Sequence, residues 1–177
     1  MAPPDRVSRS DGHAAQRDAR RLALSALFEA EFGQHTARDI LERHLADEGA
    51  GAEAAALSRR IVEAAVVQRD DLDSRIERIA PQYPVVQLAR IDRALLRSAM
   101  GELLHCPTTP ARVAIAEWVE MARTYSGEAA RRLVNGVLGR VATEAADRGR
   151  DMSASGNSSE GGGDRHTGGS TGDSIDL

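Results

Sequence analysis

Apolar residues recur at steps of three and four along most of the chain, which is the spacing of one buried face on an α-helix. The first such stripe lies within the first thirty residues and comprises Ala19, Ala23, Ala26, Leu27 and Ala30, widened by Leu24 and Phe28. We predict a helix over about 14–32 that stops at Gly33, because glycine suits the left-handed conformation that follows a helix end.

The same periodicity continues in further segments, each with local start or stop signals. Thr36 with Asp39 three positions on is typical of a helix start, and Pro110 fits a first helical position, where its missing N–H costs no intrahelical bond. We also weigh a break into two helices at Asp70-Asp71. The predicted helical segments span about 36–49, 53–80, 86–105, 110–125 and 128–146.

Two prolines divide the pattern near its middle. Pro81 and Pro84 each remove a backbone donor and disfavour helix in the preceding residue, so we place a boundary between two subdomains there. Beyond residue 147 glycine and serine dominate, and such a segment buries too little apolar surface to offset its ordering entropy. The predicted divisions are a flexible N-terminus 1–13, helical subdomains 14–80 and 81–147, and a disordered tail 148–177.

Composition favours an all-α fold, because alanine, leucine, arginine and glutamate dominate and residues typical of strands are scarce. All 23 basic side chains are arginine, and the net charge is −4. The near-neutral body does not by itself indicate a nucleic-acid-binding protein. A lone Cys106 excludes an internal disulfide, and we find neither an apolar run of membrane length nor a signal peptide, which predicts a cytoplasmic protein.

Motifs for enzymatic chemistry are missing from the sequence. We find no glycine-rich phosphate loop, nucleophile elbow or paired histidine ligands, and we therefore expect no cofactor and no metal. Gly136 and Gly139, in an otherwise apolar segment, predict a close approach by a neighbouring helix. Four acidic residues are expected on solvated helix faces: Glu102, Glu117, Glu120 and Glu128.

Arginines share one predicted face of the first helix. Arg17, Arg20 and Arg21 are spaced by three and four residues, and arginine offers a planar fork for phosphates and a plane that stacks on unpaired bases. A solvated helix face explains the spacing equally well. Residues 81–147 carry eight arginines against seven acids, whereas 36–80 carry seven against ten, so positive charge is concentrated in the first helix and the second half. We therefore predict a composite RNA surface across these two regions.

Four ordered segments resemble the NusB transcription antitermination family. The first begins at Arg17-Asp18-Ala19-Arg20-Arg21 and ends at Phe28. The others are Ile91-Asp92-Arg93-Ala94-Leu95-Leu96-Arg97 leading to Glu102-Leu103, Pro110 through Glu117, and Leu133-Val134-Asn135-Gly136-Val137-Leu138. Together they cover about 17–140, and their order makes the resemblance specific.

This resemblance implies two packed helical bundles, no catalysis and binding to boxA RNA of ribosomal RNA operons. It also implies a heterodimer with NusE, a small-subunit ribosomal protein, which acts with other Nus factors and RNA polymerase in rRNA transcription. Arg17 and Arg20 match the arginine-rich RNA-binding motif of the family, and Arg21 extends it. The remaining predicted site residues are Arg123, Tyr125 and Arg132 on the RNA path and Phe28 and Asp92 at the protein-partner surface.

Other functions stay open at this stage. A homodimeric protein-interaction module with little RNA affinity fits the net charge and an arginine cluster interrupted by Asp18. A small helical enzyme that holds an acidic substrate with arginines is a further alternative. The related RNA methyltransferases, in which a similar helical domain precedes a catalytic one, do not fit, because nothing after residue 147 could form a cofactor-binding sheet.

Overall fold

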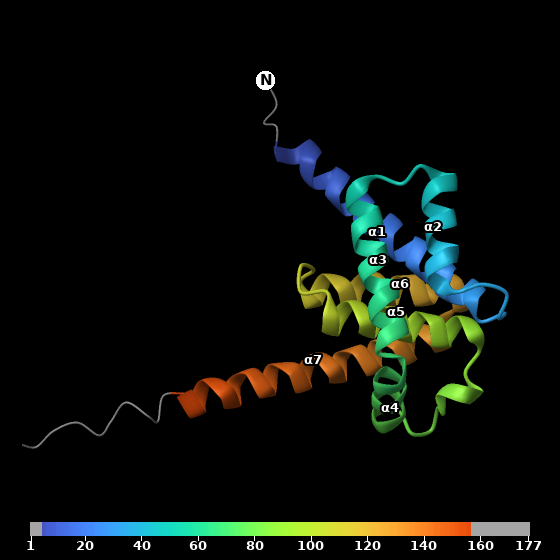
Figure 1. Ribbon diagram of the computed structural model, residues 1–177. Helices are drawn as coiled ribbons and strands as arrows, with labels where there is room; N and C mark the ends of the chain where they lie inside the picture. Colours follow the sequence, from blue (N-terminus) through green and yellow to red (C-terminus); the bar gives the residue numbers. More distant parts are fainter. Residues whose placement is uncertain (1–4, 157–177) are drawn as a thin grey trace, which may run out of the picture. The chain divides into compact units, whose positions relative to one another are not determined.

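The computed structural model describes residues 5–156, which contain helices and no strand (Figure 1). This confirms the all-α prediction. The elements, in chain order, are α1 Asp5–Ala30, α2 Ala37–Glu48, α3 Ala52–Val67, α4 Arg69–Ile79, the 3-10 turn η1 Val85–Gln87, α5 Arg90–His105, α6 Ala111–Ser126 and α7 Glu128–Gly156.

Helix ends follow the local signals of the sequence. The Thr36 hydroxyl accepts a hydrogen bond from the backbone N–H of Asp39 at 3.2 Å, which caps the start of α2, and Gly49 ends that helix with φ +60°. Pro110 is the residue just before α6, so the helix begins one position later than predicted. The weighed break near Asp70-Asp71 is present two residues earlier, at Gln68, where α3 gives way to α4.

The first and last helices are longer than the sequence indicated. Helix α1 begins at Asp5, directly after Pro4, so residues 5–13 are helical rather than irregular. Helix α7 continues past 147 to Gly156. The chain separates into two compact units after Thr143, which is close to the predicted end of the second subdomain. Residues 1–4 and most of the predicted tail, 157–177, lie outside the described part.

One hydrophobic core crosses the predicted subdomain boundary. Helix α1 packs against α2, α3 and α5, and α5 packs against α3 and α6 (Figure 1). The proline interruption is present as the segment between α4 and α5 that carries η1. Buried side chains from both sides of it join one cluster, among them Leu22, Ile61, Leu72, Leu95, Leu96, Trp118 and Leu138. The helices of the two halves are therefore stabilised by the same core.

The close helix approach occurs at a different glycine from those predicted. A Cβ atom on Gly101 of α5 would lie 3.3 Å from the backbone nitrogen of Ala65 on α3, so the two helices meet there at backbone distance. Gly136 and Gly139 are exposed, and a Cβ on either would meet nothing within 4 Å. Our prediction of close packing at these two positions in α7 is wrong, because this face of the helix is turned to solvent.

Several exposed ion pairs join arginine to glutamate in the described part of the chain. In each, the arginine hydrogen bond holds the pKa of the carboxyl below its ordinary value of 4.5. The pairs concerned are Arg43–Glu29, Arg59–Glu42, Arg21–Glu48, Arg38–Glu63, Arg123–Glu120 and Arg131–Glu128.

Acidification should therefore destabilise the fold below about pH 4.5. The unfolded chain binds protons on these carboxyls at a higher pH than the folded chain does, so stability is constant above the unfolded pKa and falls as pH drops through the lowered folded pKa values. Thermal unfolding followed from pH 7 to pH 3 measures this loss. Because the pairs are exposed, 1 M NaCl should flatten the pH dependence, and an unchanged slope in high salt would contradict their contribution.

Candidate nucleic-acid interface

Arg17 lies on the surface of α1 and is joined to α6. Its Nε donates to Glu117 Oε2 at 3.0 Å and its second terminal nitrogen donates to Oε1 at 3.2 Å. The arginine side chain is 72% exposed, whereas that of Glu117 is 26% exposed. Glu117 is therefore less solvated than the sequence predicted, and it ties the arginine-rich segment of α1 to the helix that follows α5.

Arg20 points into the core, so the prediction that it shares an exposed face with its neighbours is wrong. Its side chain is 1% exposed and makes a bidentate ion pair with Glu102 of α5, at 2.9 and 2.8 Å. The indole N–H of Trp118, on α6, donates to the same carboxylate at 2.7 Å. Glu102 was predicted to be solvated, but its side chain is fully buried. In this conformation no edge of the Arg20 guanidinium is open to RNA.

A signal for this burial was present in the sequence. Arg20 stands three and four residues before Ala23 and Leu24, which both belong to the apolar stripe, so it lies on the buried side of α1. A charged group is stable there only with a partner, because the cost of desolvating an unpaired charge is several kcal/mol. Sequence reasoning missed Glu102 and Trp118, which stand 82 and 98 residues further along the chain.

Arg21 is partly exposed at the crossing of α1 and α2. Its guanidinium pairs with Glu48 at the end of α2 and lies 3.9 Å from Asp18. The pKa of Arg21 is raised, chiefly by the hydrogen bond with Glu48 and to a smaller extent by the charges of Asp18 and Tyr125. The charge of Tyr125, near the end of α6, thus acts on this part of α1.

The predicted residues of the second half gather at the corner between α6 and α7. Arg123 and Tyr125 are exposed on the last turns of α6, and Gly127, with φ +96°, turns the chain into α7. Arg123 pairs with Glu120. Both Arg123 and the exposed Arg132 act on the carboxyl of Glu128, whose pKa they help to lower after its main partner Arg131.

These interactions link α1 to α6 through Arg17 and Glu117, and they place Arg123 and Arg132 around Glu128 at the start of α7. We call this surface the α1–α6 face and define it by Arg17, Arg21, Arg123, Tyr125 and Arg132. Arginines supply charge and hydrogen-bond donors for phosphates, and an exposed tyrosine supplies a ring on which a base can stack. Three of the four arginines also have a glutamate partner, so the α1–α6 face is almost neutral.

The two predicted protein-partner residues lie where the end of α1 meets the start of α5. Phe28 packs edge-on against the exposed Phe32, with ring centroids 5.4 Å apart, and the guanidinium carbon of Arg90 lies 4.7 Å from the centre of the Phe32 ring. Asp92 is half-buried, and its Oδ1 atom is buried without a hydrogen-bond partner. Phe32 and Arg90 were missed by sequence reasoning, which had no means of pairing the two helix ends.

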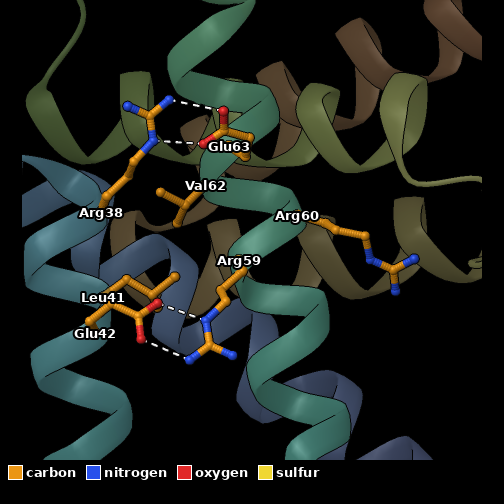
Figure 2. A pocket seen from close by; sticks show the side chains of 7 residues that line it. All are labelled: Arg38, Leu41, Glu42, Arg59, Arg60, Val62 and Glu63. Carbon is orange, nitrogen blue, oxygen red and sulfur yellow. Dashed lines mark hydrogen bonds and ion pairs between the residues drawn. The ribbon is translucent and has the colours of Figure 1, made fainter.

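A shallow hollow between α2 and α3 lies apart from these residues (Figure 2). Leu41 and Val62 line its floor. Arg38 donates to Glu63 at 2.6 and 2.9 Å, and Arg59 donates to Glu42 at 2.7 Å through both nitrogens, so an ion pair bridges the two helices at each end. Like Arg17–Glu117, each of these is an arginine–glutamate pair between two helices. Their residues can therefore be substituted as controls in experiments on the α1–α6 face.

Neither a metal centre nor a membrane span is found in the described part of the chain. No group of three histidine, cysteine or acidic side chains is arranged to hold a metal ion there. None of the helices in that part combines the length and apolarity that crossing a bilayer requires. Cys106 is buried, which together with the nearby Glu102 raises the pKa of its thiol to about 11, so the thiol stays protonated at neutral pH.

The described part of the chain is an all-helical fold that carries exposed arginine and tyrosine side chains, a surface chemistry typical of proteins that bind nucleic acids. The model of the NusB family matches residues 17–143, and the chain belongs to this family.

Similar proteins support this membership over most of their length. A transcription antitermination protein NusB from Dehalococcoides mccartyi is 39% identical over 133 residues, which cover 75% of this chain and 93% of that protein. The NusB protein of Chloroflexus aggregans is 42% identical over 133 residues, covering 73% and 89%.

Two solved structures share the fold. NusB from T. maritima superposes with a TM-score of 0.68 at 33% identity, covering 73% of this chain and 91% of that one. A crystal structure of the antitermination factors NusB and NusE in complex with double-stranded RNA contains a chain that matches with a TM-score of 0.65 at 21% identity, covering 72% and 96%. At that identity the second match shows the fold alone.

Proposed function

We propose that this protein is a transcription antitermination factor that binds boxA RNA of ribosomal RNA operons together with NusE. The observation that carries this proposal is the α1–α6 face, where the exposed Arg17 of α1 pairs with Glu117 of α6, the helix that also bears the exposed Tyr125. Membership of the NusB family supports it. The role is one of binding rather than catalysis, and contact with nascent RNA places the proposed activity in the cytoplasm.

The protein partner is proposed to dock where α1 ends and α5 begins. Phe28 and the exposed Phe32 offer aromatic surface, and the half-buried Asp92 stands two residues after Arg90, which lies over the Phe32 ring. RNA and NusE would then contact α1 about three helical turns apart, RNA near its middle at Arg17 and NusE near its C-terminal end at Phe28. RNA polymerase and other Nus factors are proposed to join through this complex.

Alanine at both Arg17 and Arg132 should weaken binding to a single-stranded boxA oligonucleotide about 10–100-fold, because each lost charge-assisted hydrogen bond contributes about 1.5–3 kcal/mol before compensation by water and salt. With three to four phosphate contacts, the logarithm of the affinity of the parent should fall with the logarithm of the salt concentration at a slope of about −2 to −3. Because the variant lacks two contacts, its slope should be shallower by about 1.4. Fluorescence anisotropy at several salt concentrations, with and without NusE, measures both.

The matched control is Arg38→Ala with Arg59→Ala, which removes two arginines from the hollow between α2 and α3. Its affinity for boxA RNA should stay within about twofold of the parent, since only screened, distant charge is lost. Equal weakening by the two double variants would refute the assignment of the α1–α6 face, because net charge alone would then explain the effect.

A second candidate function is a homodimeric interaction module with little affinity for RNA. It is favoured by the ion pairs that neutralise Arg17, Arg21 and Arg123 on the α1–α6 face. Sedimentation with and without boxA RNA separates the two candidates. A dimer that does not shift when RNA is added would support the interaction module, whereas an RNA-dependent shift supports the antitermination factor.

A further inference from the structure

Carboxylates accompany the arginines of the α1–α6 face. Glu117 holds Arg17 through two hydrogen bonds, Glu48 holds Arg21, and Glu120 holds Arg123 with a shortest contact of 2.5 Å. These acids come from different elements: Glu48 ends α2, and the other two stand on α6. A surface whose only task was to attract phosphate would leave such arginines without acidic neighbours.

An occupied guanidinium binds phosphate less readily. In Arg17 the Nε and one terminal nitrogen already donate to Glu117, so a phosphate must either displace the carboxylate or share the guanidinium with it. Sharing brings two negative groups within a few ångströms of each other, and displacement leaves the half-buried Glu117 without its cation. Both routes reduce the affinity that the arginine would otherwise provide.

We propose that Glu117, Glu48 and Glu120 are affinity-limiting residues that compete with RNA phosphates for the arginines of the α1–α6 face. This inference rests on the proposed RNA-binding function. By cancelling the charge of the face, the three acids reduce binding of polyanions through electrostatic attraction alone. Stable binding then requires contacts that charge does not supply, such as base stacking on Tyr125 and the surface added by the protein partner.

Glu117 is the strongest of the three competitors. Its side chain is 26% exposed and is held on α6, whereas Arg17 is 72% exposed at the end of a flexible side chain. The carboxylate therefore stays in place while the guanidinium can turn toward solvent. This asymmetry makes Arg17 the mobile member, which exchanges between Glu117 and a phosphate, and makes Glu117 the residue whose charge decides how readily it leaves.

Neutralising these acids should strengthen RNA binding. Glu117→Gln keeps the shape of the side chain and one acceptor oxygen for Arg17 but removes the charge. We expect each of E117Q, E48Q and E120Q to raise affinity about threefold, as the strength of an exposed ion pair suggests, and the triple variant to raise it about 10–30-fold. The probes are a boxA oligonucleotide and a scrambled one, measured by anisotropy on the full chain; both should gain.

Glu63→Gln is the matched control. Glu63 is exposed like Glu120 and accepts two hydrogen bonds from Arg38, but Arg38 stands ten residues before Glu48, about 15 Å along α2. E63Q makes the same change in net charge and should alter RNA affinity less than about 1.5-fold. An equal gain for E63Q and E117Q would overturn the proposal, because overall charge would then be responsible.

Three further outcomes bear on this inference and on the proposed function. If Arg17→Ala weakens RNA binding but E117Q leaves it unchanged or weakens it, Glu117 orients the arginine and the competition is refuted, while the RNA-binding function stands. If neither the parent nor the triple glutamine variant binds RNA, both proposals fail. RNA binding by the triple variant where the parent shows none supports the competition. Thermal unfolding of each variant verifies that the fold is retained.

Discussion

Glu102→Gln should lower the free energy of unfolding by about 3–5 kcal/mol, since it leaves a buried charge without its counter-ion. Arg20 is 1% exposed and directs both its Nε and a terminal nitrogen at Glu102. Glutamine offers only one acceptor oxygen and no charge, so the guanidinium stays buried and uncompensated. Because small domains are stable by only about 5–15 kcal/mol, this one change removes a large share of the total.

Urea denaturation followed by fluorescence measures the loss, since Trp118 is the single tryptophan of the chain and donates a hydrogen bond to Glu102. The control is Glu63→Gln in the exposed pair with Arg38, which should cost less than about 1 kcal/mol. Replacing both buried partners, Arg20→Met with Glu102→Leu, should restore much of the stability, because an apolar pair of similar volume needs no counter-charge. A cost below about 1 kcal/mol for E102Q would contradict burial of the pair.

Trp118→Ala should lower the free energy of unfolding by about 3–5 kcal/mol, because it empties the site of the largest fully buried side chain. The indole stands at the junction of α5 and α6, and its removal also takes one donor from Glu102. Thermal unfolding monitored by circular dichroism measures the loss, since the tryptophan signal is absent from this variant.

Trp118→Phe separates volume from hydrogen bonding. Phenylalanine retains most of the apolar contact but cannot donate to Glu102, so we expect a cost of about 1–3 kcal/mol, the penalty for a buried acceptor that loses a donor. If the phenylalanine variant proved as unstable as the alanine variant, the hydrogen bond rather than the packing would govern this junction. Either result shows which interaction of Trp118 holds α6 in place, and the same helix carries Arg123 and Tyr125.

Helix positions could be predicted well from the sequence, because their signals are local. Thr36 and Gly49 bound α2, and Pro110 directly precedes α6, so these local residues alone indicated the helix ends to within one position. The early start of α1 at Asp5 escaped prediction because the residues after Pro4 carry no apolar stripe. An apolar period identifies helices that bury one face. It gives no signal for helical residues that are exposed on all sides.

The candidate site was predicted less completely, because the partner of a charged residue is not a local property. Arg17 and Arg20 look alike in the sequence, three residues apart on one helix, yet one is a surface residue and the other belongs to the core. The difference arises from Glu117 and Glu102, which lie 100 and 82 residues further along the chain. The partners of Arg21 and Arg123 likewise became visible only in three dimensions.

The sequence by itself determined the all-α class, most helix ends and the segments that place the chain in the NusB family, because capping, proline geometry and the helical period act over a few residues. The tertiary structure decided which arginines face solvent, which acids neutralise them and where two helices meet at Gly101. These features depend on which helices pack against each other. That arrangement is determined by contacts between side chains that are far apart in the sequence.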